Sequence, residues 1–362
     1  MKKSRNYNID LIRLLALFCV VAVHFFLNSG YYDTIMHGKK MLVMTIFRSL
    51  FMICVPLFIT LTGFLMCEKK LSMKYYKRLI SVIFTYFLCS MVYSLFFKYY
   101  INNPMNVFIF FKNVFSYKGT PYGWYIEMYI GLFLVIPFLN MIVDNLDSKC
   151  FFQVLLLTLI VMVSLPGMIN IYNLKSLDWW SFPAGSNEYY KIIPSWWVQI
   201  YPLLYYFLGA YFRKYNIKYD SKKILLFLGI VILINGSFNF YRSYNSTFVS
   251  DTWNDYYSLF TFIQTALVFS LFLNLKISIN SNRVKFVLEK LSSASFGAYL
   301  ISCIFDNIFY CFLIKHVPNV SDRFIYAPII VLLVYICSLL LALVIDYVQT
   351  LIMCFFKKKF HC

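Results

Sequence analysis

The sequence predicts an all-α integral membrane protein with about ten transmembrane helices and both termini in the cytoplasm. First, the chain is 61% hydrophobic and only 13% charged, which is too little charge to cover a soluble protein of 362 residues. Second, apolar stretches long enough to cross a hydrocarbon core of about 30 Å recur along the whole chain. Third, lysines and arginines gather in alternate connections between these stretches.

Ten apolar stretches are expected to cross the membrane, and they follow one another with short connections. In order, they cover roughly residues 8–28, 43–67, 76–100, 122–142, 150–170, 196–213, 222–240, 254–275, 293–315 and 325–356. The first stretch is followed by no small-x-small cleavage site, so we expect it to remain as a helix. No connection is long enough for a soluble domain, and residues 1–362 are therefore expected to form a single membrane domain.

The basic residues predict the orientation. If the N-terminus is cytoplasmic, the inner segments hold roughly twice as many lysines and arginines as the outer ones. This bias predicts that both termini lie in the cytoplasm, and we expect a multi-pass protein of the cell membrane. Because the net charge of +18 follows the loops in this way, it does not indicate a nucleic-acid partner. The ten cysteines have no paired or metal-ligand spacing, so we expect no metal site.

The tryptophans are expected at or beyond the outer boundary of the membrane. They are Trp124, Trp179, Trp180, Trp196, Trp197 and Trp253. An outer aromatic belt would account for them. The alternative is a stacking surface for a flat-faced ligand such as a sugar ring, with the outer loops 101–121 and 171–195 as its walls.

Four ionisable residues lie inside the predicted spans at a similar depth in the outer half of the membrane: His24, Arg48, Glu127 and Asp306. Because an ionisable group in lipid costs at least a few kcal/mol, each is a functional candidate. One interpretation is a structural network of ion pairs. The other is a site in which His24 acts as a general base with a carboxylate that orients it.

Arg13 and His24 are spaced so that they share one face of the first helix. Eleven residues correspond to about 1,100°, or about 20° beyond three turns, and to about 16.5 Å along the axis. An extended pantetheine arm has a comparable length. Arg13 could therefore bind a phosphate of coenzyme A while the thioester reaches toward His24. Asp10, three residues before Arg13, could pair with it.

These residues, in DLIRLLALFCVVAVH, resemble the first-helix signature of the membrane acyltransferase-3 family. Later segments resemble further landmarks of that family in order. They are FRSLFMICVPLFITLTGFLM at 47–66, MKYYKRL at 73–79, GWYIEMYIGLFLVIPFLN at 123–140, YYFLGAYFRK at 205–214 and LSSASFGAYLI at 291–301.

The resemblance implies a ten-helix acyltransferase. Such a protein moves an acyl group, usually acetyl, from cytoplasmic acetyl-coenzyme A to a hydroxyl of a cell-envelope glycan or lipid-linked sugar at the outer face. No bound cofactor is implied beyond this donor substrate, acyl-CoA. By the same resemblance His24 is the catalytic base and Arg13 the donor-side cation.

The sequence departs from the family pattern at two places. The inner basic loop often carries a second arginine three residues after the first, but Ser81 stands at that position. We expect Lys74, Lys77 and Arg78 to bind the donor phosphates instead. The histidine that often follows Tyr-Leu-Ile in the ninth helix is replaced by Ser302, which leaves its role absent or with Asp306.

The leading hypothesis is therefore an O-acyltransferase in which Glu127 orients His24. Arg48 would offset charge on the tetrahedral oxygen or bind the acceptor, for which Trp124 and Asp306 are also candidates. The alternative is a transporter of a small anion or a lipid-linked sugar. Transporters often contain two corresponding broken helices, and the sequence has no such pair of Gly/Pro-interrupted spans.

Overall fold

The computed structural model describes residues 5–102, 106–170, 192–215 and 219–359. Within these ranges the chain is helical and contains no strand, apart from one isolated bridge between Met36 and Tyr244. The predicted all-α membrane fold is confirmed.

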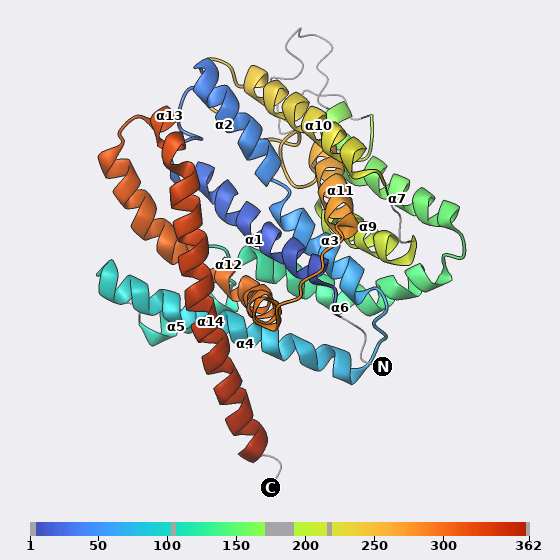
Figure 1. Cartoon of the computed structure of the whole chain (residues 1–362), viewed down its shortest axis with the longest axis vertical. Coiled ribbons are helices and arrows are strands. Elements are labelled where there is room, and N and C mark those ends of the chain that lie inside the picture. The colour runs from blue at the N-terminus through green and yellow to red at the C-terminus, as the bar shows by residue number, and fades with distance from the viewer. Residues whose placement is uncertain (1–4, 103–105, 171–191, 216–218, 360–362) are drawn as a thin grey trace.

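The helices pack around the first of them (Figure 1). In chain order they are α1 (Tyr7–Asn28), α2 (Gly38–Phe51), α3 (Cys54–Met66), α4 (Met73–Tyr100), α5 (Val107–Phe115), α6 (Trp124–Asn145), α7 (Lys149–Val163), α8 (Pro166–Ile169), η1 (Val198–Ile200), α9 (Tyr201–Tyr215), α10 (Ser221–Arg242), α11 (Leu259–Asn274), α12 (Asn282–His316), α13 (Val320–Arg323), η2 (Phe324–Tyr326) and α14 (Ala327–Lys359). Several begin at a side-chain cap, such as Ser72 before α4 and Ser281 before α12.

Seven helical segments of the described chain are long and apolar enough to cross a membrane. The α2 and α3 helices together form one of them. In three further expected spans the helices are shorter: α7 has 15 residues, α9 has 15 and α11 has 16. A helix thus lies within each of the ten expected spans, while the number of membrane crossings remains a prediction.

The second expected span is broken into α2 and α3 at Met52 and Ile53. Pro56 causes the break, because it has no N–H to donate to the carbonyl of Met52 and its ring crowds that carbonyl. The break turns Met52 and Cys54 toward a cavity of the protein.

The α1 helix is enclosed by other helices and contacts α2, α3, α11, α12 and α14 (Figure 1). Its apolar side chains, including Ile12, Leu17 and Val20, are buried in the main core. A polar side chain on this helix therefore faces protein groups or an internal cavity and not lipid.

Two glycines allow α3 and α9 to approach closely. A Cβ atom at Gly63 would lie 2.0 Å from the carbonyl oxygen of Tyr206, and one at Gly209 would lie 1.9 Å from that of Thr60. Small residues permit such backbone contact between helices in membranes. This contact fixes α3, which carries part of the lining of both cavities described below.

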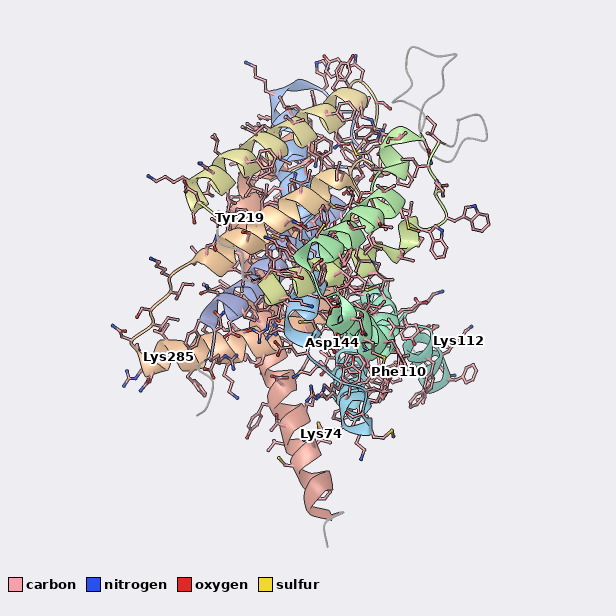
Figure 2. All side chains as sticks on the ribbon, turned by 90° about the vertical axis from the view of Figure 1, so that its right-hand side faces the viewer. Lys74, Phe110, Lys112, Asp144, Tyr219 and Lys285 are labelled. Carbon is pink, nitrogen blue, oxygen red and sulfur yellow. The ribbon has the colours of Figure 1, made fainter. Side chains whose placement is uncertain are left out.

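The periphery of the bundle is apolar. Figure 2 shows α5 at its edge, with Phe110 and Lys112, and the exposed side chains of this helix include Phe108 and Phe115. The C-terminal part of α14 projects away from the other helices (Figure 1). Exposed aromatic side chains of this kind suit contact with the bilayer.

We predict that Gly209→Ala destabilises the protein, because the new methyl group would overlap the backbone of α3. Overpacking of this kind costs about 1–3 kcal/mol. The matched control is Gly131→Ala in α6, where a Cβ meets no atom within 4 Å. Thermal unfolding of the purified protein in one detergent should show a lower Tm for Gly209→Ala alone. Equal shifts in the two variants would contradict this account of the α3–α9 contact.

Candidate active site

A cavity of about 560 Å³ lies between α1, the α2–α3 break, the start of α6, α12 and the connection from α10 to α11. We call it the His24 cavity. Three of the predicted site residues line it: His24, Arg48 and Trp124. Its other lining residues include a set of polar and aromatic side chains: Tyr122, Asn254, Asp255, Tyr256, Tyr257 and Tyr299.

His24 lies between a carboxylate and a phenol ring. Its Nδ1 atom is 3.6 Å from Oδ2 of Asp306 on α12, whose side chain is 3% exposed. Tyr122 donates a hydrogen bond of 2.6 Å to the same Oδ2 atom. The imidazole stacks on the Tyr122 ring with a centroid separation of 4.0 Å. The carboxylate and the ring together fix the plane and the direction of the imidazole.

The contact between His24 and Asp306 is not a hydrogen bond at this distance. Within the described parts of the chain, His24 Nδ1 and Asp306 Oδ1 are both buried without a hydrogen-bond partner. A buried polar atom left unpaired is costly, and a shorter distance between Nδ1 and Oδ2 would pair the His24 nitrogen while leaving Oδ1 without a partner. With Nδ1 directed at Asp306, the imidazole has Nε2 left to act on a group in the cavity.

Arg48 is buried on α2 and is held by groups other than carboxylates. Its Nε donates to the Tyr32 hydroxyl at 3.0 Å, and its Nη1 donates to the carbonyl of Asn254 at 3.0 Å. Its guanidinium also lies 4.5 Å from the centre of the Phe248 ring. Through the contact with Asn254, Arg48 anchors the connection between α10 and α11, which lines the His24 cavity.

Glu127 does not line the His24 cavity. The expectation that it meets His24, Arg48 and Asp306 in one pocket is therefore corrected. It is exposed on α6, whereas its neighbours Tyr125 and Ile126 are buried. The prediction rested on depth along the helix, which gives no information on direction around the axis. The carboxylate beside His24 is Asp306 instead.

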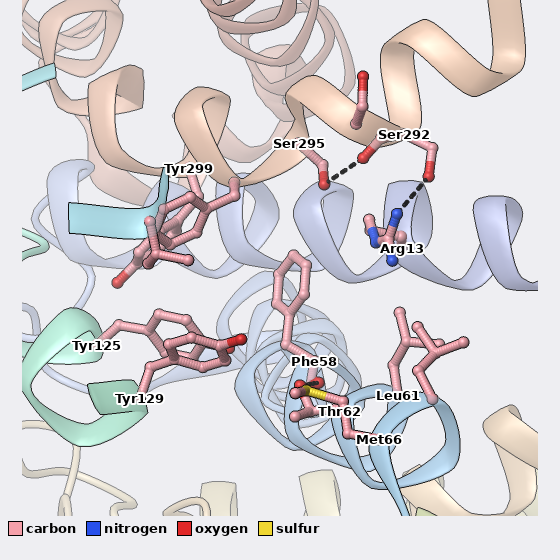
Figure 3. A pocket seen from close by; sticks show the side chains of 14 residues that line it. Arg13, Phe58, Leu61, Thr62, Met66, Tyr125, Tyr129, Ser292, Ser295 and Tyr299 are labelled. Carbon is pink, nitrogen blue, oxygen red and sulfur yellow. Dashed lines mark hydrogen bonds between the residues drawn. The ribbon is translucent and has the colours of Figure 1, made fainter. Parts of the chain in front are cut away.

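The Arg13 cavity is a second, smaller cavity of about 280 Å³ between α1, α3, α4, α6 and α12. Figure 3 shows Arg13 at one end, where its Nη1 donates to the Ser292 hydroxyl at 3.1 Å. The opposite end is lined by aromatic rings, among them Tyr125, Tyr129 and Tyr299 (Figure 3).

Two donor-side expectations differ from the structure. Asp10 does not pair with Arg13, because its two carboxylate oxygens accept from Arg5 Nε and Nη2, each at 2.8 Å. The basic residues of α4, namely Lys74, Lys77 and Arg78, are exposed on its first turns and do not line the Arg13 cavity. Val82, one turn further along α4, does.

Tyr299 on α12 is the residue that lines both cavities. Its hydroxyl donates to the backbone carbonyl of Tyr122 at 2.9 Å, and its ring packs edge-on against Tyr125 with centroids 5.4 Å apart. The side chain is buried. Arg13 and His24 are therefore presented by α1 to two cavities that meet at Tyr299 and not to one open tunnel.

Sequence reasoning missed Tyr122, Asp255 and Tyr299 as site residues. Tyr299 lies within the segment LSSASFGAYLI, and its place in this family landmark was a signal that could have identified it. Tyr122 and Asp255 had none, since a single tyrosine is indistinct among 31 and Asp255 falls close to the end of an expected span. Trp179 and Trp180 lie outside the described residues, as does most of the loop 171–195.

A family model described as an acyltransferase domain matches residues 6–345. No curated protein and no solved structure matches the chain. In the described residues, no group of three or more His, Cys, Asp and Glu side chains is placed to hold a metal ion.

Proposed function

The chain belongs to the membrane acyltransferase-3 family, and from this premise we propose that it is an O-acetyltransferase with His24 as its general base. The proposed donor is acetyl-coenzyme A, bound from the cytoplasm. The proposed acceptor is a hydroxyl of a cell-envelope glycan or lipid-linked sugar at the outer face of the cell membrane. The observation that carries the proposal is the pairing of the His24 imidazole with the Asp306 carboxylate at the edge of a cavity.

The proposed reaction is a direct transfer. Nε2 of His24 takes the proton of the acceptor hydroxyl, whose oxygen attacks the thioester carbonyl carbon. Asp306 stabilises the imidazolium that forms. When the tetrahedral intermediate collapses, the carbon–sulfur bond breaks and the imidazolium returns its proton to the sulfur of coenzyme A. The products are the acyl ester and free coenzyme A.

Arg13 is the proposed donor-binding cation. The Arg13 cavity is small, about 280 Å³, and mostly apolar between Arg13 and its aromatic end. That size suits a slender pantetheine arm better than a nucleotide. The nucleotide would then remain near the exposed Lys74, Lys77 and Arg78. Arg13 would bind the phosphate next to the pantetheine arm, at the point where the arm enters the cavity. For the acyl group to meet His24, the Tyr299 side chain must move aside.

Purified protein with acetyl-coenzyme A labelled in the acetyl group tests this proposal against the transporter alternative. We expect label to appear covalently on an envelope glycan fraction as coenzyme A is released. Uptake of the glycan or of an anion into proteoliposomes without any covalent label would favour the transporter.

We predict that His24→Gln lowers kcat by about 10²- to 10⁴-fold, the usual contribution of a general base. The matched control is His37→Gln, because His37 is exposed and lies outside both cavities. Gel filtration and Tm should show that both variants fold. Transfer by His24→Gln at the rate of the control would remove His24 from the reaction.

We predict that Arg13→Lys raises the KM for acetyl-coenzyme A more than the KM for the acceptor. An ammonium keeps the charge but does not reproduce the bidentate geometry of guanidinium on phosphate. Arg283→Lys, an exposed arginine at the start of α12, is the control. Steady-state kinetics with each substrate varied in turn measures the effect, and a change confined to the acceptor KM would place Arg13 elsewhere.

We predict that Tyr299→Ala increases the hydrolysis of acetyl-coenzyme A in the absence of acceptor. Removing the ring joins the two cavities, so water beside His24 gains access to the thioester. Tyr299→Phe keeps the ring and loses only the hydrogen bond to Tyr122, and it should stay near the wild-type rate. Release of the free thiol reports the hydrolysis. Equal rates in the Ala and Phe variants would show that the ring is no barrier.

A further inference from the structure

The segment 250–257, which belongs to the connection from α10 to α11, is held from one side by contacts with α10. Arg242 forms a buried ion pair with Asp251, in which Nη1 donates to Oδ1 at 3.0 Å. The amide of Asn254 donates to Asn239 Oδ1 at 2.9 Å and to the Val249 carbonyl at 2.8 Å. These contacts order the segment without using Asp255.

The same segment is held from the other side by Arg48 of α2, through the hydrogen bond from Nη1 to the Asn254 carbonyl. Two arginines on different helices thus fix one short connection. Neither forms an ion pair with Asp255 in the structure as described. A fixed backbone presents side chains to a ligand at a lower entropic cost than a mobile one.

Asp255 lines the His24 cavity, and its carboxylate has capacity to accept further hydrogen bonds. Its Oδ1 accepts from the backbone N–H of Tyr256 at 2.6 Å. The Asp255 side chain is partly buried. A carboxylate removed from water in this way gains from hydroxyl donors on a ligand.

An aromatic surface lies on the same cavity. Trp124, at the start of α6, stacks on Tyr256 with centroids 5.8 Å apart and planes inclined by 19°. Trp124 is 39% exposed, although most residues of this cavity are buried or partly buried. A partly exposed flat ring suits the C–H face of a sugar, whose hydroxyls point sideways toward hydrogen-bond acceptors.

We infer that the segment 250–257 and Trp124 form the binding subsite for the acceptor, which is a neutral pyranose ring. Asp255 accepts hydrogen bonds from hydroxyls of that ring, and Trp124 with Tyr256 provides the stacking face. Arg48 and Arg242 are positioning residues that hold the segment in place. The inference rests on the proposed function, since the acceptor hydroxyl must reach His24 in the same cavity.

Saturation-transfer difference NMR tests the subsite without any catalysis. The probe is methyl β-D-glucopyranoside, and the protein is reconstituted in nanodiscs free of glycoside detergent. We expect transfer to the sugar ring protons in the wild type and its loss in Asp255→Asn. The matched control is Asp33→Asn, which changes the same charge on an exposed residue that lies outside both cavities.

Trp124→Leu is the second variant, because a partly exposed residue at a helix start is replaced without disturbing the core. It should lose transfer to the ring C–H protons as Asp255→Asn does. The subsite is overturned if the wild type shows no transfer, or if both variants match Asp33→Asn.

Kinetics separate failure of the subsite from failure of the proposed function. With a productive acceptor, Asp255→Asn should raise the acceptor KM by about 10-fold or more, because hydrogen bonds to a charged group are lost. The KM for acetyl-coenzyme A should not change. An unchanged acceptor KM overturns the subsite and leaves the enzyme assignment intact. Sugar binding lost in Asp255→Asn, in a protein that transfers no acetyl group, supports the subsite and refutes the enzyme assignment.

Discussion

The placement of His24 beside Asp306 is the contact around which the structure is arranged, because it keeps two ionisable side chains of membrane-spanning helices away from lipid. An ionisable side chain in a membrane-spanning helix costs about 3 kcal/mol when it faces lipid. Here α1 carries the imidazole, α12 carries the carboxylate, and Tyr122 before α6 donates to that carboxylate. The three segments must remain in register for these contacts to persist. This requirement explains why α1 is enclosed and why α12 is one of its neighbours.

The second constraint follows from the proposed transfer, because a protein that moves an acyl group across a membrane must keep the two aqueous sides apart. Arg13 and His24 lie on one helix but in two cavities, and the aromatic ring of Tyr299 stands where those cavities meet. Its hydrogen bond to Tyr122 links this barrier to the residue that stacks on His24. Tyr122 therefore contacts both the proposed barrier residue, Tyr299, and the proposed base, His24.

The sequence predicted positions along the helices better than directions around them. Apolar length located a helix in each of the ten expected spans but not α5, and helix rise grouped His24, Arg48 and Asp306, which do share one region. Rise alone does not give the angle around an axis, so Glu127 was expected beside His24 although it is exposed. By its spacing in the sequence, Asp10 has two basic neighbours, Arg13 within the helix and Arg5 just before it. In the structure Asp10 pairs with Arg5. The role of Arg48 in holding a distant connection depends on tertiary contact and had no local signal.

In the proposed mechanism an acyl group passes from the Arg13 cavity to the His24 cavity within one protein. The decisive experiment uses sealed proteoliposomes with labelled acetyl-coenzyme A trapped inside and the glycan acceptor outside. For protein molecules oriented with their N-terminus inside, we expect labelled ester on the external glycan while coenzyme A stays inside. Label formed only when donor and acceptor are present on the same side of the membrane would rule this mechanism out.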